Sequence, residues 1–398
     1  MESSAYLPAL GIAAVKFSLM CVVIAGLLRL ARGRLNRDDL RRVFRVVFIL
    51  VLYVNVAALV LSSFSDRWGF RGDSKHWGLE KLLAYEAESP FGYRVLSPMI
   101  INAGIALVPD AAVQGNTEWL LEKTPLLRFR RPGESWNVEK AVAFHVAYFY
   151  MFASLLAALY AARWVTALAA PPSALLVDLG PPIALLFLPM TFHFGGYLYD
   201  FAELAWLFVF LGLLIKERWA ASSAVLVLAT LNKESNILLV LYLLAIGYGR
   251  MTRAGLVRHA LAQASIGLAA IAIVRYVLAD VPVGHHNDWL GLNVLFWLDP
   301  RAYFGVIQPY APLIPTPRGA NVLSLFVVGS FVFWGWPSAS SELRRLAVVT
   351  AVVNLPLLFL LGFLDEIRNL SLMFPAIYLL ACHAMTKLWE GARVRPGH

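Results

Sequence analysis

The sequence predicts an all-α protein, a single domain over residues 1–398 that forms a polytopic transmembrane helical bundle of about eleven spans. Sixty per cent of its residues are hydrophobic and its mean hydropathy is +0.67, values too apolar for an ordinary soluble globule. Apolar runs of about 17–25 residues recur along the chain, and a helix of that length crosses the ~30 Å hydrocarbon layer. These runs lack the period-two alternation of β-barrel strands.

The charge and the cysteines exclude several other classes. The chain carries 34 Lys and Arg against 25 Asp and Glu, but the basic residues cluster just beyond the apolar runs. That is the positive-inside pattern of membrane proteins, so we expect no nucleic-acid partner. The two cysteines, Cys21 and Cys382, lie inside apolar runs and offer neither a disulfide framework nor a zinc-binding spacing. We therefore expect no metal site from cysteine or histidine ligands.

The first two helices set the orientation. Residues 6–28 form an apolar run with no basic segment before it and no clear cleavage site after it, so we expect a retained helix and not a signal peptide. Residues 29–45 hold seven arginines against two aspartates, which predicts a cytoplasmic loop. The N-terminus is then expected outside, and residues 46–63 lead the chain back out.

Residues 64–139 are expected to form a long first external loop. This segment has balanced charge and no full-length apolar span. Its most apolar piece, residues 95–108, is too short to cross a bilayer comfortably. We expect a juxtamembrane helix that lies along the membrane surface.

The rest of the chain alternates between the two sides and ends inside. Two short apolar runs, 220–231 and 237–248, have basic residues at both outer ends, which predicts a hairpin with Lys233 at an outward tip. Residues 279–320 are expected to form a second external loop. The remaining spans are predicted at 140–165, 182–194, 198–215, 256–278, 321–336, 346–364 and 370–387.

This topology gathers ionisable residues on the outer side, where charges near membrane depth are costly and usually functional. A carboxylate and an arginine brought together there could form an acid–base and anion-binding site. The candidates are Asp66, Asp73, His76, Arg94, Asp200, Glu203, Lys233, Glu234, Glu366 and Arg368.

Each candidate also has a structural interpretation. Asp66 and Asp73 could be solvated loop acids. Asp200 and Glu203, three apart, share a helix face and could form an acid–base pair, bind a metal, or bond to Lys233 or Arg275.

The basic candidates leave alternatives open as well. Lys233 needs an anion, which Glu234 or a ligand phosphate could supply. Arg368 could anchor the chain at the interface. Because Glu366 precedes it by two residues, we favour a phosphate contact for Arg368.

Three motifs together resemble the GT-C superfamily of multispanning glycosyltransferases. The first is the loop Asp73 followed by Pro-Phe-Gly-Tyr-Arg-Val-Leu-Ser-Pro at residues 90–98. The second is Thr-Leu-Asn-Lys-Glu-Ser at 230–235, between two short apolar runs. The third is Glu366-x-Arg368 before Phe-Pro at 374–375. The motifs are short, but their order spans most of the chain.

The resemblance implies a function and roles for single residues. Asp73 matches the catalytic base of the family, with Asp66 as second choice, and Lys233 and Arg368 match basic residues near the lipid phosphate. The implied donor is a polyprenyl-phosphate sugar, and the implied acceptor is a glycan, lipid or protein. The implied place is the bacterial inner membrane, with the site facing the periplasm. The extra helix at 6–28 and the lack of a C-terminal soluble domain depart from the pattern, and the latter disfavours oligosaccharyltransferase-like relatives.

The chemistry suits these residue types. A positioned carboxylate can take the acceptor proton, and arginine and lysine stabilise charge on a leaving phosphate. Direct displacement inverts the anomeric carbon, and a divalent cation could share the phosphate work. The main alternative is a transporter or flippase for a lipid-linked or anionic solute, although we find no internal repeat of the kind many transporters show. A third alternative, a non-catalytic membrane scaffold, does not explain why Lys233 and Arg368 are present.

Overall fold

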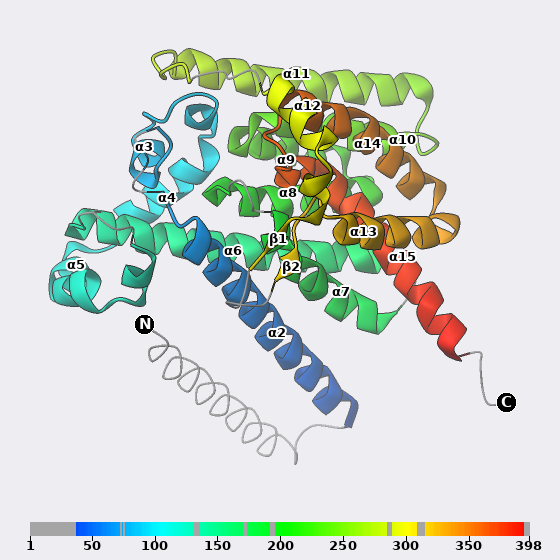
Figure 1. Ribbon diagram of the computed structural model, residues 1–398, viewed down its shortest axis with the longest axis horizontal. Helices are drawn as coiled ribbons and strands as arrows, with labels where there is room; N and C mark the ends of the chain where they lie inside the picture. The colour runs from blue at the N-terminus through cyan, green and yellow to red at the C-terminus, as the bar shows by residue number, and fades with distance from the viewer. Residues whose placement is uncertain are drawn as a thin grey trace. The chain divides into compact units, whose positions relative to one another are not determined.

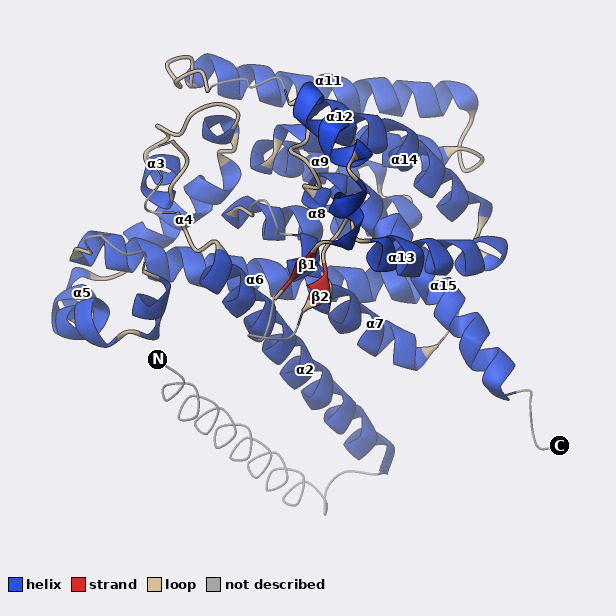
Figure 2. Cartoon of the chain, in the orientation of Figure 1, coloured by secondary structure: helices blue, strands red, loops and turns tan. Residues whose placement is uncertain are grey.

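The computed structural model describes residues 37–71, 74, 76–130, 136–169, 173–191, 196–284, 289–308 and 315–393. Figure 1 and Figure 2 show an almost wholly helical chain. It divides into two units, residues 1–54 and 55–398, and everything described below lies in the second unit except the start of helix α2. The helix predicted at 6–28 lies outside the described residues.

The described elements are mainly α-helices and short helical turns. The α-helices are α2 (Arg37–Arg67), α3 (Leu79–Leu83), α4 (Leu96–Ala106), α5 (Asp110–Gly115), α6 (Val138–Ala169), α7 (Ala174–Leu186), α8 (Leu198–Ile215), α9 (Trp219–Asn232), α10 (Val240–Gly247), α11 (Arg253–Val277), α12 (Leu290–Leu298), α13 (Val322–Gly335), α14 (Ser341–Leu361) and α15 (Phe374–Arg393). Short 3-10 or π turns are η1 (Phe91–Tyr93), η2 (Trp119–Lys123), η3 (Pro125–Phe129), η4 (Leu188–Thr191), η5 (Glu234–Leu239), η6 (Pro300–Phe304), η7 (Trp336–Ser338) and η8 (Ile367–Met373).

By length and composition, seven helical segments among the described residues can cross a membrane, which confirms the predicted membrane helical character. They are Asp38–Arg67, Val138–Ala169, Ala174–Thr191, Leu198–Ile215, Arg253–Val277, Ser341–Leu361 and Ile367–Trp389. Four apolar helical segments are shorter: Leu96–Ala106, Trp219–Asn232, Glu234–Gly247 and Val322–Ser338. Helix α4 is only 11 residues, roughly 16 Å, so it is too short to span alone. The total of eleven spans stays a prediction.

Side-chain caps define where several helices begin. Ser173, Thr252, Asn321 and Ser340 each accept a hydrogen bond from a backbone amide in the first turn of α7, α11, α13 and α14. These amides have no partner within the helix, and such caps typically stabilise it by about 1 kcal/mol. The helix starts are therefore fixed by polar residues that precede apolar runs.

Several predicted boundaries were wrong, among them the following three. The arginine-rich segment predicted as a loop is helical from Arg37 onward, because arginine forms helices well and Asp38 and Asp39 suit the positive N-terminal end. Helix α7 begins eight residues before the predicted start at 182, and Pro181 and Pro182 lie inside it. The first residues of the predicted last span belong to the 3-10 turn η8, so the α-helix itself starts at Phe374.

The second predicted external loop contains a small two-stranded sheet that the all-α prediction missed. Strand β1 (Val306–Ile307) pairs antiparallel with β2 (Thr316–Pro317), with Val306 opposite Pro317. The same loop contains α12. Asn293 of α12 donates to the carbonyls of Phe359 and Gly362 at 2.9 and 2.7 Å, which ties this loop to the end of α14.

The bundle packs α6 against α8, α8 against α9, and α13 against α15 (Figure 1). Helices α9 and α10 form a hairpin along α11. Gln263 of α11 donates to Ser222 near the start of α9, and Arg275 near the end of α11 pairs with Glu234 just past the tip. Further along, Gly247 at the end of α10 lies against Leu256 near the start of α11. The chain therefore reverses at Lys233, whose backbone is extended (φ −159°, ψ 122°).

Candidate ligand site: a buried ion cluster

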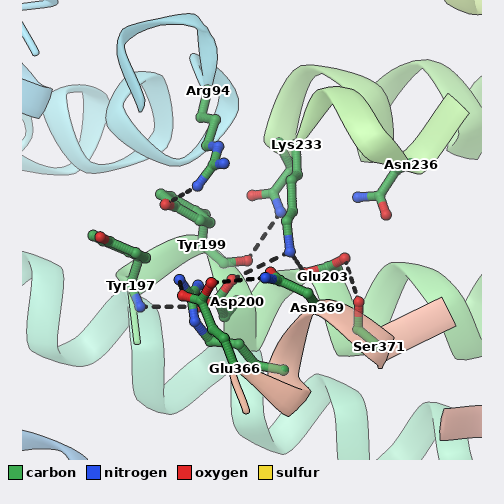
Figure 3. Close-up of polar contacts among 12 residues, drawn as sticks. Arg94, Tyr197, Tyr199, Asp200, Glu203, Lys233, Asn236, Glu366, Asn369 and Ser371 are labelled. Carbon is green, nitrogen blue, oxygen red and sulfur yellow. Dashed lines mark hydrogen bonds and ion pairs between the residues drawn. The ribbon is translucent and has the colours of Figure 1, made fainter. Parts of the chain in front are cut away.

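Six of the predicted candidates meet in one buried group, which we call the ion cluster. Its members are Arg94, Asp200, Glu203, Lys233, Glu366 and Arg368 (Figure 3). They come from the end of η1, the first turns of α8, the tip of the α9–α10 hairpin and the start of η8. Segments separated by more than 250 residues thus supply one site.

Helix α8 supplies two carboxylates one turn apart. Asp200 caps its own helix, because its Oδ2 accepts the backbone N–H of Tyr197 at 2.9 Å. The same oxygen accepts from Nη1 of Arg368 at 2.8 Å. Glu203 follows on the same face, and the two residues are only 6% and 2% exposed. Carboxylates buried this deeply stay charged only when they are paired.

Lys233 pairs with both of these carboxylates. Its Nζ donates to Oε2 of Glu203 at 2.7 Å and lies 3.6 Å from Oδ1 of Asp200. The other oxygen of Glu203 accepts from Ser371 Oγ at 2.8 Å. The partner named above as one alternative, Glu234, is wrong: Glu234 pairs with Arg275 at 3.1 Å. Successive side chains leave an extended backbone in opposite directions, so Lys233 and Glu234 diverge.

Arg368 links α8 to the loop that contains Glu366. Its Nη1 bonds Asp200 and its Nη2 bonds a carboxylate oxygen of Glu366. Asn369 donates to the other oxygen of Glu366 at 2.7 Å. The guanidinium lies 4.7 Å from the ring centre of Tyr197. Its Nε is buried and has no hydrogen-bond partner among the described residues.

Arg94 lies at the edge of the cluster and contacts it through Tyr199. Its guanidinium lies 4.3 Å from the ring centre of Tyr199 and donates to the Tyr199 hydroxyl. Burial lowers the pKa of the Arg94 guanidinium, and the nearby Asp200 carboxylate opposes that shift. Burial also raises the pKa of the Tyr197 hydroxyl. Arg94 is thus a cation at the edge of the cluster without a direct carboxylate partner in any ion pair described.

A neutral hydrogen-bond network holds the elements in register. Asn232, which is fully buried, donates to the carbonyl of Tyr199 at 2.9 Å and accepts from Ser97 Oγ at 2.7 Å. Ser97 also contacts the hydroxyl of Tyr150 in α6 at 2.6 Å. The residue before Lys233 is therefore bonded to the residue before Asp200. Sequence reasoning did not identify Asn232, Ser97, Tyr199 or Ser371, although their positions beside the motifs were a usable signal.

The remaining candidates lie elsewhere. Asp66 is exposed in the last turn of α2, and His76 pairs with Glu88. Asp73 lies outside the described residues. Its neighbour Ser74 accepts the backbone N–H groups of His76 and Trp77, each at 3.3 Å. The structure therefore does not bring Asp66, His76 or Glu234 into the ion cluster.

The cluster pairs cations with carboxylates among the described residues. Among the described residues it holds three cations (Arg94, Lys233, Arg368) and three carboxylates (Asp200, Glu203, Glu366), so its formal charge is zero. Asp200 accepts a hydrogen bond from Arg368, and Glu203 accepts one from Lys233, so both carboxylates already have cationic partners. Within the described part of the chain, no group of three or more His, Cys, Asp or Glu side chains could hold a metal ion.

No family model matches this sequence, and no curated protein matches it.

Proposed function

We propose that this protein is an integral membrane glycosyltransferase of the GT-C type, which moves a sugar from a polyprenyl-phosphate carrier to an acceptor. The ion cluster is the observation that carries the proposal. Buried ionisable residues within membrane helices are expensive and mark substrate sites. Here Lys233 and Arg368, from two separate motifs, both pair with Asp200, and Arg94 from a third motif lies beside them against Tyr199.

The cations are the proposed contacts of the donor phosphate. When the bond between the anomeric carbon and the phosphate oxygen breaks, its electron pair stays on the phosphate. Preorganised cations in a water-poor site stabilise such developing charge most effectively. In this scheme Lys233 supplies a point charge and Arg368 a planar fork, while Asp200 and Glu203 hold both side chains in place.

The base in this proposal is Asp73, with Asp66 as second choice. The acceptor oxygen attacks the anomeric carbon, a new glycosidic bond forms, and the acceptor proton passes to the Asp73 carboxylate. Asp200 and Glu203 suit this role less well, because each carboxylate already has a cationic partner within the cluster. One direct displacement inverts the anomeric carbon, and a divalent cation bound with the donor could assist the phosphate.

The proposed location is the bacterial inner membrane, with the cluster toward the periplasmic side. The basic flanks of the predicted cytoplasmic loops support this orientation. The hairpin tip at Lys233 and the start of α8 lie at the end of α11 opposite to its basic N-terminal turn. The acceptor is a glycan, a lipid or a protein on that face.

The direct test is turnover. Purified protein is incubated with a panel of polyprenyl-phosphate sugars and candidate acceptors, and the released polyprenyl phosphate is measured. We expect release with at least one donor and its loss in Asp73→Asn. No release with any donor from protein that is folded would count against the proposal.

A transporter or flippase for a lipid-linked anion is the second candidate, and one observation favours it. The hairpin consists of two short helices, α9 and α10, that meet at a charged tip inside the bundle. Broken helices whose ends face a substrate are common in transporters. Movement of a labelled polyprenyl-phosphate sugar across vesicles, without cleavage of the sugar, would support this candidate.

A further inference from the structure

Glu366 differs from the other two carboxylates of the ion cluster in how it is held. Asp200 and Glu203 are mounted on the rigid helix α8 and bond to residues far away in sequence, with side chains 7% and 2% exposed. Glu366 lies in the loop between α14 and η8, and its side chain is 12% exposed. It is the most accessible carboxylate of the cluster.

The described bonds of the Glu366 carboxylate are all local. It accepts from Arg368, two residues on, and from Asn369, three residues on. Both donors belong to the turn that follows Glu366 itself. The carboxylate can therefore leave Arg368 without breaking a described hydrogen bond to another helix. Leu364, in the same loop, has an uncommon backbone conformation with φ +52°.

The guanidinium of Arg368 has one edge that only Glu366 occupies. Nη1 is committed to Asp200, whereas Nη2 bonds Glu366 and Nε has no hydrogen-bond partner among the described residues. Nε–H and Nη2–H lie on the same edge and point in parallel. This edge is the fork that binds carboxylate or phosphate with two parallel hydrogen bonds. Glu366 bonds Nη2 and leaves Nε without a hydrogen-bond partner among the described residues.

We propose that Glu366 is a displaceable counter-ion and that a singly charged phosphodiester headgroup takes its place on Arg368. The phosphodiester bonds Nε and Nη2 together, a contact that Glu366 makes only in part. This inference rests on the proposed function for its ligand, the donor headgroup.

The charge balance of the cluster favours a headgroup with one negative charge. With Glu366 in place, the described cluster is neutral, as counted above. When Glu366 swings out, two carboxylates remain against three cations, and the net charge becomes +1. One phosphodiester, with one negative charge, restores neutrality. A diphosphate would leave a net negative charge in a buried site, which is costly.

The experiment measures binding and not turnover. The probes are farnesyl methyl phosphate, a phosphodiester with one charge, and farnesyl diphosphate. Each is titrated into purified full-length protein in neutral detergent, and binding is followed by tryptophan fluorescence and by the shift in thermal midpoint. The proteins are wild type, Glu366→Gln and Glu366→Asp. The matched control is Glu342→Gln, which removes a carboxylate from another arginine pair, Arg250–Glu342 at 2.7 Å.

The proposal predicts that Glu366→Gln binds the phosphodiester about tenfold more tightly than wild type, because the competing carboxylate is gone. Glu366→Asp shortens the side chain, and its affinity for the phosphodiester should lie between those of wild type and Glu366→Gln. This variant keeps the test valid if Glu366→Gln folds poorly. The control should bind as wild type does. Wild type should prefer the phosphodiester to the diphosphate.

Weaker or unchanged binding in both Glu366 variants would overturn the displacement, and a preference for the diphosphate would overturn the charge argument. If the binding results hold while no sugar is transferred from any donor, the anion site stands and the glycosyltransferase proposal fails. The two failures are therefore distinguishable.

Discussion

Asp200 and Arg368 are 168 residues apart in the sequence and form a buried ion pair, with 2.8 Å between Oδ2 and Nη1. The pair joins the first turn of α8 to the start of η8. Both partners have further contacts, since Asp200 caps α8 and Arg368 binds Glu366. The pair is thus part of a network that fixes where two distant motifs meet.

Breaking this pair should destabilise the protein strongly. Asp200→Asn or Arg368→Met removes one member of a buried ion pair, which typically costs about 3–5 kcal/mol. The double variant should cost clearly less than the sum, because the attraction between these two charges is lost in each single variant and can be lost only once. Thermal or denaturant unfolding in detergent measures this cycle. The exposed Asp299–Arg301 pair is the control, where we expect far smaller coupling. Additive effects at Asp200 and Arg368 would contradict the network.

Asp73→Asn should lower the rate of sugar transfer by ~10²–10⁴-fold, since it keeps the shape of the side chain and removes its basicity. Initial rates at saturating donor measure the effect. Asp66→Asn is the comparison and should retain activity. If Asp66→Asn loses activity while Asp73→Asn retains it, the base is Asp66. If neither matters and Glu203→Gln abolishes transfer, the base lies on α8.

Arg368→Lys should weaken donor binding with a smaller loss of folding stability than Arg368→Met. Lysine keeps the positive charge beside Asp200, but it replaces a bidentate fork by a point charge. We expect a rise in KM for the donor of about tenfold, the size of one charge-assisted hydrogen bond. Donor titrations of the initial rate give KM and kcat separately. An unchanged KM would contradict a contact between Arg368 and the phosphate of the bound donor.

Asp365 should make folding stability depend on pH. Burial raises its pKa to about 6, although Nε of Arg318 lies 2.9 Å from its carboxylate. The folded protein then holds this proton more tightly than the unfolded chain does. The associated stability is fully present below pH 3.8 and is lost as the pH rises through about 6.

The difference between these two pKa values corresponds to about 3 kcal/mol. The thermal midpoint measured from pH 4 to pH 7 should fall, and Asp365→Asn should flatten that profile. Asp110→Asn, at an exposed position in α5, should leave it unchanged. A profile of the same slope in wild type and Asp365→Asn would refute the assignment.

Cysteine labelling in a Cys21→Ser, Cys382→Ala background should test the orientation. Single cysteines at Glu86 and Arg301 report the two predicted external loops, and one at Glu217 reports a predicted cytoplasmic turn. These side chains are 60%, 90% and 58% exposed, so label access is not limited by burial. A membrane-impermeant maleimide added to intact spheroplasts should label the first two only. Labelling of position 217 alone would invert the topology.

Local sequence was enough to predict most helices and some of their ends. Each predicted span between residues 46 and 387 overlaps a helical segment among the described residues, because apolar composition and length alone decide that a segment must bury its backbone amides in a helix. The reversal at Lys233 was also predicted, since a polar tetrapeptide between short apolar runs can hardly continue one span. The start of α7 was not predicted, because Pro181 and Pro182 suggest a helix boundary, whereas the helix begins at the cap formed by Ser173.

The sequence by itself determined that the protein is an all-α protein with apolar helices long enough to cross a membrane, and it determined the residue types of the candidate site. Only the tertiary structure decided the partners: Lys233 with Glu203 and not with Glu234, Arg368 with Asp200, and Asn232 as the bond between two motifs. The reason is physical. Hydrophobicity is a property of each segment and can be read locally, whereas an ion pair depends on which side chains from distant segments point to the same place, and that is set only when the helices pack.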